Sequence, residues 1–330
     1  MISFSTCWSR KKHFFDRILE IQEMGFSHVE VSHGVRVPGI QQTLKRIAKG
    51  MSAPISSVHN FCPHPIDVGG YSPDTFEPTS HRTRDRSRWQ RLTLGSIETA
   101  SKLNAQAVVL HLGRIPLPKV TSQLGEWAEH RQLFSRRYVQ TKLKTVAKRA
   151  KLAPKYLDRV KKQLEPIVEA AAQANIQLGI ECRDQFEQVP THEEVLDLLE
   201  TFHGGPVGYW HDFGHAQIQD HLGFLDHKEC LQALGPSTIG CHIHDVTWAR
   251  RDHRIPFTGL IDWDALVPFL PDNCLQVFEL HYRQPKRDIP QARDTWIALW
   301  NKNHPPAHPP QEISQPPPQA NPKATAQAKH

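Results

Sequence analysis

The segment VGYWHDFGH, residues 207–215, decides the fold, because in it a buried strand runs directly into side chains that bind metals. Its aromatic and β-branched residues are typical of a buried strand, which ends at Asp212, and His215 follows three residues later. Other apolar runs also end on a histidine or a glutamate, namely His59, His111, Glu181, His242 and Glu279. In a parallel barrel the carboxyl ends of all strands meet on one face. These runs therefore predict a shared site at the mouth of such a barrel.

Strand-like and helical segments alternate eight times along the chain. The predicted strands cover 2–6, 28–32, 55–59, 107–112, 177–182, 207–212, 238–243 and 275–280. The predicted helices cover 11–24, 39–50, 82–104, 155–174, 191–203, 226–234, 262–270 and 290–302. Eight βα units within about 300 residues predict a (β/α)8 TIM barrel over residues 1–302. A doubly wound open sheet is the competing α/β fold, but it would not gather so many strand ends on one face.

Two segments depart from this repeat. Residues 113–154 predict a basic insertion after the fourth strand, on the face where barrel active sites lie, and 131–151 within it are compatible with a helix. Twelve lysines and arginines but a single acid, Asp158, lie between Arg131 and Lys162. This charge predicts either solvated helix faces or a surface that attracts phosphate groups. Residues 303–330 are rich in Pro, Ala and Gln and predict a disordered tail.

The composition disfavours several classes of protein. No apolar run approaches the roughly 20 residues needed to cross a bilayer, so we expect no membrane partner. The six cysteines form no CxxC pair, which fits a reducing cytoplasm, and the N-terminal apolar residues precede the charges, the reverse of a secretory signal. Neither GxGxxG nor GxxxxGK is present, which disfavours nucleotide-cofactor chemistry.

Four of the strand-end residues make the strongest candidate site, and we call Glu181, Asp212, His242 and Glu279 the metal set. Three carboxylates and one imidazole would suit one divalent metal ion, Mn²⁺, Mg²⁺, Co²⁺ or Zn²⁺. A cation that holds two neighbouring oxygens of a hydroxy-ketone acidifies the α-hydrogen. We expect Glu181 and Glu279 to face opposite sides of the bound carbon, so that one removes the proton and the other returns it. For each residue alone, the alternative is a buried ion pair.

The motifs HDFGHA (211–216), CHIHD (241–245) and DHRIPFTG (252–259) resemble the xylose isomerase-like barrel superfamily, and the resemblance runs from Met1 to about Trp300. The superfamily includes ketose 3-epimerases, inosose dehydratases, hydroxypyruvate isomerases and type-IV abasic-site endonucleases. The resemblance implies that the metal set binds the catalytic metal and that its two glutamates transfer protons. In ketose epimerases the positions of Glu187 and His215 contact the sugar. Trp248 stands where those epimerases have an arginine, so a free ketohexose is not implied.

The endonuclease branch is the rival. By resemblance to it, four histidines occupy ligand positions of a three-metal site; we call His59, His111, His215 and His253 the flanking histidines. The one position that departs is an aspartate two residues before the last histidine, where Arg251 stands and would repel a third metal. In an isomerase the flanking histidines would bind substrate, together with Glu187. His244 is expected to point into the helical layer.

The sequence therefore predicts a cytoplasmic sugar or sugar phosphate isomerase or epimerase that uses one divalent metal ion. It would act on a small polyhydroxylated carbonyl substrate by proton transfer through a metal-bound enediolate. The alternatives are a zinc-dependent abasic-site endonuclease-like phosphodiesterase, a dehydratase of the same superfamily, and a barrel that binds a ligand without catalysis. Nucleic acid is the less favoured partner, although the basic insertion would suit phosphates, and a homo-oligomer is compatible with such a barrel.

Overall fold

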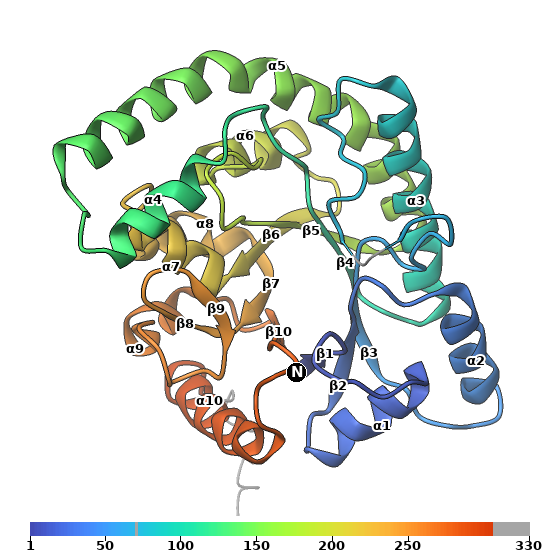
Figure 1. The fold of residues 1–330 in the computed structure, drawn as a ribbon. Coiled ribbons are helices and arrows are strands. Elements are labelled where there is room, and N and C mark those ends of the chain that lie inside the picture. The colour runs from blue at the N-terminus through green and yellow to red at the C-terminus, as the bar shows by residue number, and fades with distance from the viewer. Residues whose placement is uncertain (70–71, 306–330) are drawn as a thin grey trace, which may run out of the picture.

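The fold is a closed barrel of eight parallel strands, in the order β1-β10-β7-β6-β5-β4-β3-β2 (Figure 1). The computed structural model describes residues 1–69 and 72–305. The barrel strands are β1 (Ile2–Ser5), β2 (His28–Val31), β3 (Ile55–His59), β4 (Ala107–Leu110), β5 (Gln177–Glu181), β6 (Val207–Asp212), β7 (Thr238–Ile243) and β10 (Leu275–Phe278). This confirms the predicted TIM barrel and excludes the open sheet. The predicted disorder beyond residue 305 lies outside the described residues.

Helices surround the barrel. They are α1 (Phe14–Glu23), α2 (Val37–Ile47), α3 (Thr83–Lys102), α4 (Val120–Glu129), α5 (Arg136–Ala174), α6 (His192–Thr201), α7 (Phe213–His221), α8 (His227–Leu234), α9 (Trp263–Leu266) and α10 (Ile289–Asn303). The sequence did not predict α7. Its first seven residues are all buried, so this helix lacks the solvent-facing side from which an amphipathic period is recognised. It begins where the Asp212 carboxylate accepts a hydrogen bond from the backbone N–H of His215 at 2.8 Å.

The alternation of side chains along each strand directs the metal set into the barrel. Trp210, two residues before Asp212, lies in an inner apolar cluster. The other members of that cluster likewise precede candidate ligands by two or four residues: Ala107, Val109, Leu275 and Val277. The Trp210 indole fills the space at Gly179 and Gly240, where a Cβ atom would overlap the ring. The inner residues thus form a packed apolar floor one layer below the metal set.

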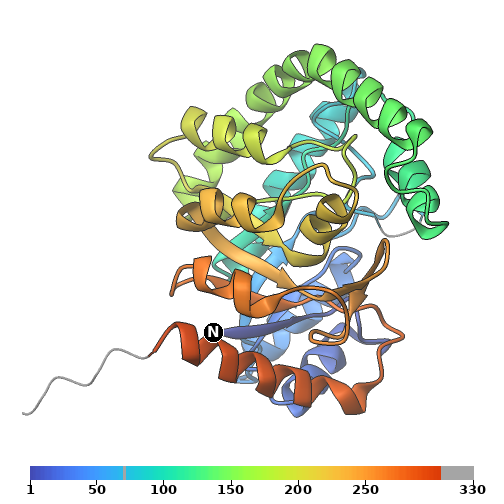
Figure 2. The same cartoon turned by 90° about the vertical axis from the view of Figure 1, so that its left-hand side faces the viewer.

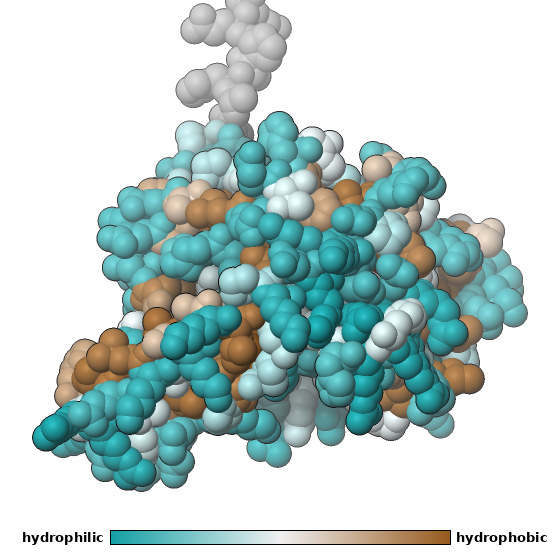
Figure 3. Space-filling model, turned by 90° about the horizontal axis from the view of Figure 1, so that it is seen from above, coloured by the Kyte–Doolittle hydropathy of each residue, from teal (hydrophilic) through white to brown (hydrophobic). Residues whose placement is uncertain are grey.

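The basic segment after β4 has a different form from the predicted insertion. It consists of α4 and the first half of α5, which is one continuous 39-residue helix with Pro154 and Pro166 inside it. Figure 2 shows α5 arching along the barrel with α4 folded back beside its first turns. Hydrophilic side chains predominate on the side of the molecule that α5 covers (Figure 3). One basic residue is an exception, because Arg149 is buried and forms an ion pair with Glu194 of α6.

A two-stranded antiparallel hairpin follows the seventh barrel strand. Its strands are β8 (Asp245–Thr247) and β9 (Arg251–Arg254). His253 in β9 has a positive φ of 50°. Its backbone N–H donates a 2.9 Å hydrogen bond to Nδ1 of His244, which follows β7. The hairpin therefore folds back over the barrel mouth. Within the described ranges, no helix has both the length and the apolar character that crossing a membrane requires.

Candidate metal centre

The metal set meets around one ring nitrogen. Nδ1 of His242 lies 3.3 Å from Oε2 of Glu279, 3.5 Å from Oδ2 of Asp212 and 3.7 Å from Oε1 of Glu181. All four side chains are buried. They come from β5, β6, β7 and the residue after β10. The structure therefore brings together residues that lie almost one hundred positions apart in the chain.

The chemistry of this group fits a divalent cation. Nδ1 of His242 is buried, yet it makes no hydrogen bond to any residue that the structure describes. Three carboxylates converge on it, and so many buried carboxylates need positive charge close to them. The ligand atoms of Glu181, Asp212 and His242 lie within 4.8 Å of one another. One cation bound between them would satisfy the orphaned nitrogen and neutralise the carboxylates.

The three carboxylates of the metal set are ionised at neutral pH. Burial alone would raise the pKa of Glu181, but His111 and Arg183 outweigh it and hold the pKa well below its usual value. Burial would likewise raise the pKa of Asp212, and nearby histidines hold it well below the usual range. For Glu279, attraction to His242 and other histidines overcomes burial and lowers the pKa to about 2. These oxygens are therefore available to a cation.

The flanking histidines lie around the metal set. Nε2 of His59 and Nε2 of His111 lie 3.2 Å and 2.8 Å from Oε2 of Glu181. Nδ1 of His215 lies 3.3 Å from one oxygen each of Glu181 and Asp212. The ring of His253 lies 6.1 Å from that of His215, so it reaches the edge of the group.

Glu187 does not join this group. Its Oε1 accepts a 2.8 Å hydrogen bond from the backbone N–H of Thr121, and its Oε2 accepts a 2.6 Å bond from the hydroxyl of Thr121. The carboxylate thus holds the first turn of α4. It is also buried, so a substrate contact would require these two bonds to be released.

The prediction for His244 is wrong, because this side chain lies in the centre. Its Nε2 lies 2.9 Å from Oδ1 of Asp212, and its ring stacks on that of His253 at 4.2 Å. His244 lies two residues beyond His242, and the strand alternation continues far enough to turn it inward. Gly214 makes room for it, because a Cβ atom there would overlap the His244 ring.

Sequence reasoning missed two further residues. Arg183 lies two positions after Glu181, and its Nη1 lies 3.0 Å from Oε1 of that glutamate. Asp74, in the segment between β3 and α3, accepts a 2.7 Å hydrogen bond from Nδ1 of His111. The alternation along β5 was a signal for Arg183, because it continues past the strand end. No pattern in the sequence marks Asp74, which lies in irregular structure.

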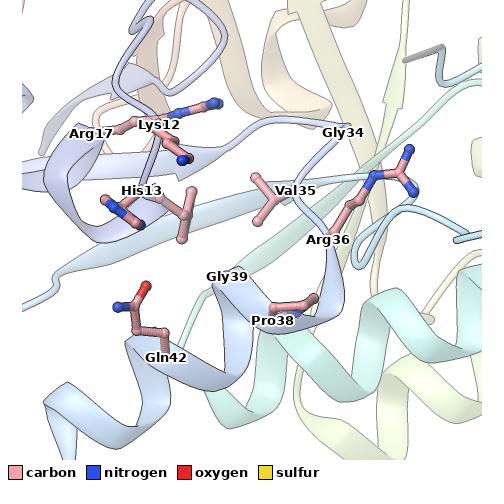
Figure 4. A pocket seen from close by; sticks show the side chains of 10 residues that line it. Lys12, His13, Arg17, Gly34, Val35, Arg36, Pro38, Gly39 and Gln42 are labelled. Atoms are coloured by element: carbon pink, nitrogen blue, oxygen red, sulfur yellow. The ribbon is translucent and has the colours of Figure 1, made fainter.

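A separate pocket of about 290 Å³ lies between the first turns of α1 and α2 (Figure 4). Three basic residues line it, namely Lys12, Arg17 and Arg36, and no acidic residue is among its described lining. None of the metal set lines it either. The segment after β2 links this pocket to the metal centre. Gly34 lines the pocket, and the ring of the preceding residue, His33, lies 5.3 Å from the ring of His59.

Comparison with solved structures shows the same fold. The chain is similar to a D-tagatose 3-epimerase-like protein, with 20% identity, a TM-score of 0.64 and coverage of 92% of this chain and 97% of that one. It is similar to the 3-keto-D-glucoside 4-epimerase YcjR from E. coli, with 14% identity, a TM-score of 0.61 and coverage of 90% and 98%. It also resembles the IOLI protein with a bound zinc atom, with 14% identity, a TM-score of 0.62 and coverage of 92% and 98%.

Sequence comparison gives one short match and one long one. The uncharacterized protein y4fM of Sinorhizobium fredii is 30% identical over 93 residues, a match that spans 28% of this chain and 29% of that protein. The model of the xylose isomerase-like TIM barrel family matches residues 18–299, which include the whole metal set. The chain therefore belongs to the xylose isomerase-like TIM barrel family.

Proposed function

We propose that this protein is a divalent-metal-dependent isomerase or epimerase of a sugar or sugar phosphate. One observation carries the proposal: two buried, ionised glutamates, Glu181 and Glu279, lie within 3.7 Å of the same orphaned nitrogen of His242. They reach it from β5 and from the end of β10, two strands that are not neighbours in the barrel. Two such bases around one reacting carbon suit the removal and return of a proton. The epimerases among the structural neighbours support this class of reaction.

The metal set would hold the cation, which when bound supplies a Lewis acid that polarises a substrate carbonyl and acidifies the neighbouring C–H bond. One of Glu181 and Glu279 then takes the proton, and the other returns it from the opposite side. His215 donates a hydrogen bond to a substrate oxygen. Although burial would lower its pKa, Asp212 and Glu181 raise that pKa to about 10, so the ring keeps its proton. His59 and His111 hold Oε2 of Glu181 in place, and His253 orients a hydroxyl group of the substrate.

A phosphate group on the substrate is compatible with the charges near the metal centre. The pocket with Lys12 and Arg17 opens beside Gly34, next to the segment that carries His33 to the centre. Arg36 also lines it, but its guanidinium points away from Lys12 and Arg17 and donates to backbone carbonyls (Figure 4). Positive side chains in a recess attract an anion such as a phosphate. The substrate panel should therefore contain free ketoses and aldoses together with their phosphate esters.

The test is hydrogen exchange with solvent. Metal-free protein reconstituted with Mn²⁺ should exchange the α-hydrogen of its substrate with deuterium from D₂O. Glu181→Gln should slow this exchange by about 10² to 10⁴-fold, because a general base contributes on that order. Glu98→Gln, an exposed position that pairs with Lys102, should exchange at the parental rate. If Glu181→Gln exchanges as fast as the parent while its circular dichroism is unchanged, the proposed proton transfer is wrong.

A zinc-dependent phosphodiesterase is the second candidate, because more than one group of side chains could hold an ion. His59, His111 and Glu181 form one such group, and His215, His244 and His253 form another. That function requires incision of a duplex at an abasic site in the presence of zinc. It also requires that the centre bind several metal ions per chain.

A further inference from the structure

Arg183 stands inside the group that would hold a second metal ion. The ligand atoms of His59, His111 and Glu181 lie within 4.8 Å of one another, so an ion bound there would share Glu181 with the metal set. Nη1 of Arg183 lies 3.0 Å from Oε1 of Glu181 and also donates a hydrogen bond to Nε2 of His111. Only 6% of Arg183 is exposed. The guanidinium is therefore buried among these candidate ligands and is not a surface charge.

The hydrogen bonds of His111 show which atom the guanidinium occupies. Nδ1 of His111 lies 2.7 Å from a carboxylate oxygen of Asp74, which can only accept when ionised, so Nδ1 carries the proton. Nε2, the other ring nitrogen, faces both the guanidinium of Arg183 and Oε2 of Glu181, which lies 2.8 Å from it. A positive group binds both residues at this end of the ring. Arg183 supplies that group to both residues.

Acidic neighbours keep Arg183 in place. Nη2 of Arg183 lies 3.8 Å from Oδ2 of Asp74, which also pairs with Arg114 at 3.9 Å. A guanidinium cannot lose its proton in a protein, so this charge does not disappear when a metal ion approaches. A divalent cation at His59 and His111 would meet a fixed positive charge at hydrogen-bond distance, which Coulomb repulsion opposes.

We infer that Arg183 takes the place of a second metal ion, so that this centre holds one divalent cation, bound by the metal set. The inference rests on the metal centre of the proposed function but not on its substrate. In the other group of histidines, His215, His244 and His253, one member is already engaged. Nδ1 of His244 accepts the backbone N–H of His253, and Nε2 of His244 donates to Asp212, so both nitrogens of His244 are already used.

The experiment counts zinc ions bound per chain, by elemental analysis after dialysis against a metal buffer and by calorimetric titration. The parent should bind one. Arg183→Met should bind two, because the lone pair of His111 and an oxygen of Glu181 become free. Arg183→Lys keeps the positive charge and should bind one. Arg114→Met removes a cation that also faces Asp74 but does not touch His111, so this matched control should bind one.

A double variant identifies the added ion. Arg183→Met combined with His111→Ala should return to one zinc per chain. A parent that binds two or three ions overturns the inference without any variant, even if Arg183→Met fails to fold. An Arg183→Met protein that binds one ion, with parental circular dichroism, also overturns it. One zinc per chain without isomerase activity would count against the proposed function but not against this inference.

Discussion

Among the individual residues, His244 shows how a side chain that is not itself a metal ligand can orient one. Its Nδ1 accepts a backbone N–H, which leaves the proton on Nε2, and Nε2 lies 2.9 Å from Oδ1 of Asp212. The imidazole therefore fixes the orientation of a metal-set carboxylate. Outer partners of metal ligands act in this way in many metal sites.

Replacing His244 should weaken metal binding without removing a ligand. We expect His244→Ala to lower Mn²⁺ affinity by about 10 to 100-fold, the usual cost of losing such a partner. Competition against a fluorescent chelator measures the affinity. His281→Ala, at an exposed position after β10, should keep the parental value. Parental affinity in His244→Ala would mean that Asp212 is oriented by other contacts.

Two buried histidines outside the barrel wall should make stability depend on pH. Nε2 of His211 lies 3.1 Å from Nε2 of His227, and burial lowers the pKa of His211 to about 3 and that of His227 well below its usual 6.5. Both therefore bind protons in the unfolded chain before they do in the folded one. Their contribution is present above about pH 6.5 and is lost as the pH falls toward the folded pKa.

Replacing His227 should make the free energy of unfolding depend less steeply on pH. For metal-free parent and His227→Gln, the free energy of unfolding is measured with urea between about pH 6.5 and pH 4.5. We expect the slope to be smaller in the variant by up to about 1.4 kcal/mol per pH unit, the value for one proton. Equal slopes would show that His227 is protonated in the folded protein.

At the scale of the element, the long helix α5 is attached to α6 through one buried ion pair. Nη1 and Nη2 of Arg149 bind the two carboxylate oxygens of Glu194 at 2.6 Å and 2.9 Å. Glu194 also accepts the backbone N–H of Thr191 in the capping box that begins α6. Lys161 and Asp197 join the same two helices at 2.7 Å, but this second pair is far more exposed.

These two pairs should differ in energy. Arg149→Met leaves the Glu194 carboxylate buried without its partner, which should cost about 3 to 5 kcal/mol of unfolding free energy. Lys161→Met removes an exposed ion pair and should cost less than about 1 kcal/mol. Urea unfolding of both variants tests this. Equal costs would show that burial does not distinguish the two pairs.

The elements show where a single sequence is informative and where it is not. The strands could be predicted because their aromatic and β-branched runs stop at ligand-type residues, and the same pattern predicted which residues meet in the metal set. The continuity of α5 could not, since Pro154 and Pro166 normally interrupt a helix and only packing against α3, α4 and α6 compensates. Residues such as Asp74 escaped prediction because long-range contacts alone bring them to the site.

For the molecule as a whole, metal binding at the site should be coupled to the stability of the folded barrel. The metal set comes from three barrel strands and from the residue that follows a fourth, and β1 pairs with both β10 and β2 to close the ring. An unfolded chain cannot hold these four ligands around one cation. Metal binding should therefore stabilise the folded barrel as a unit, and chelation should remove that stabilisation.

The stabilisation of the folded barrel by bound metal has a predictable size. At a free Mn²⁺ concentration of about one hundred times its dissociation constant, the free energy of unfolding should rise by about 2.7 kcal/mol, if the unfolded chain does not bind the ion. Glu279→Gln keeps the shape of the side chain but removes one charged ligand, so the same Mn²⁺ concentration should stabilise this variant much less. Thermal and urea unfolding with Mn²⁺ and with EDTA measure both. A parental response in Glu279→Gln would show that Mn²⁺ binds elsewhere, because the barrel mouth offers Glu279 as the ligand that closes the metal set from β10.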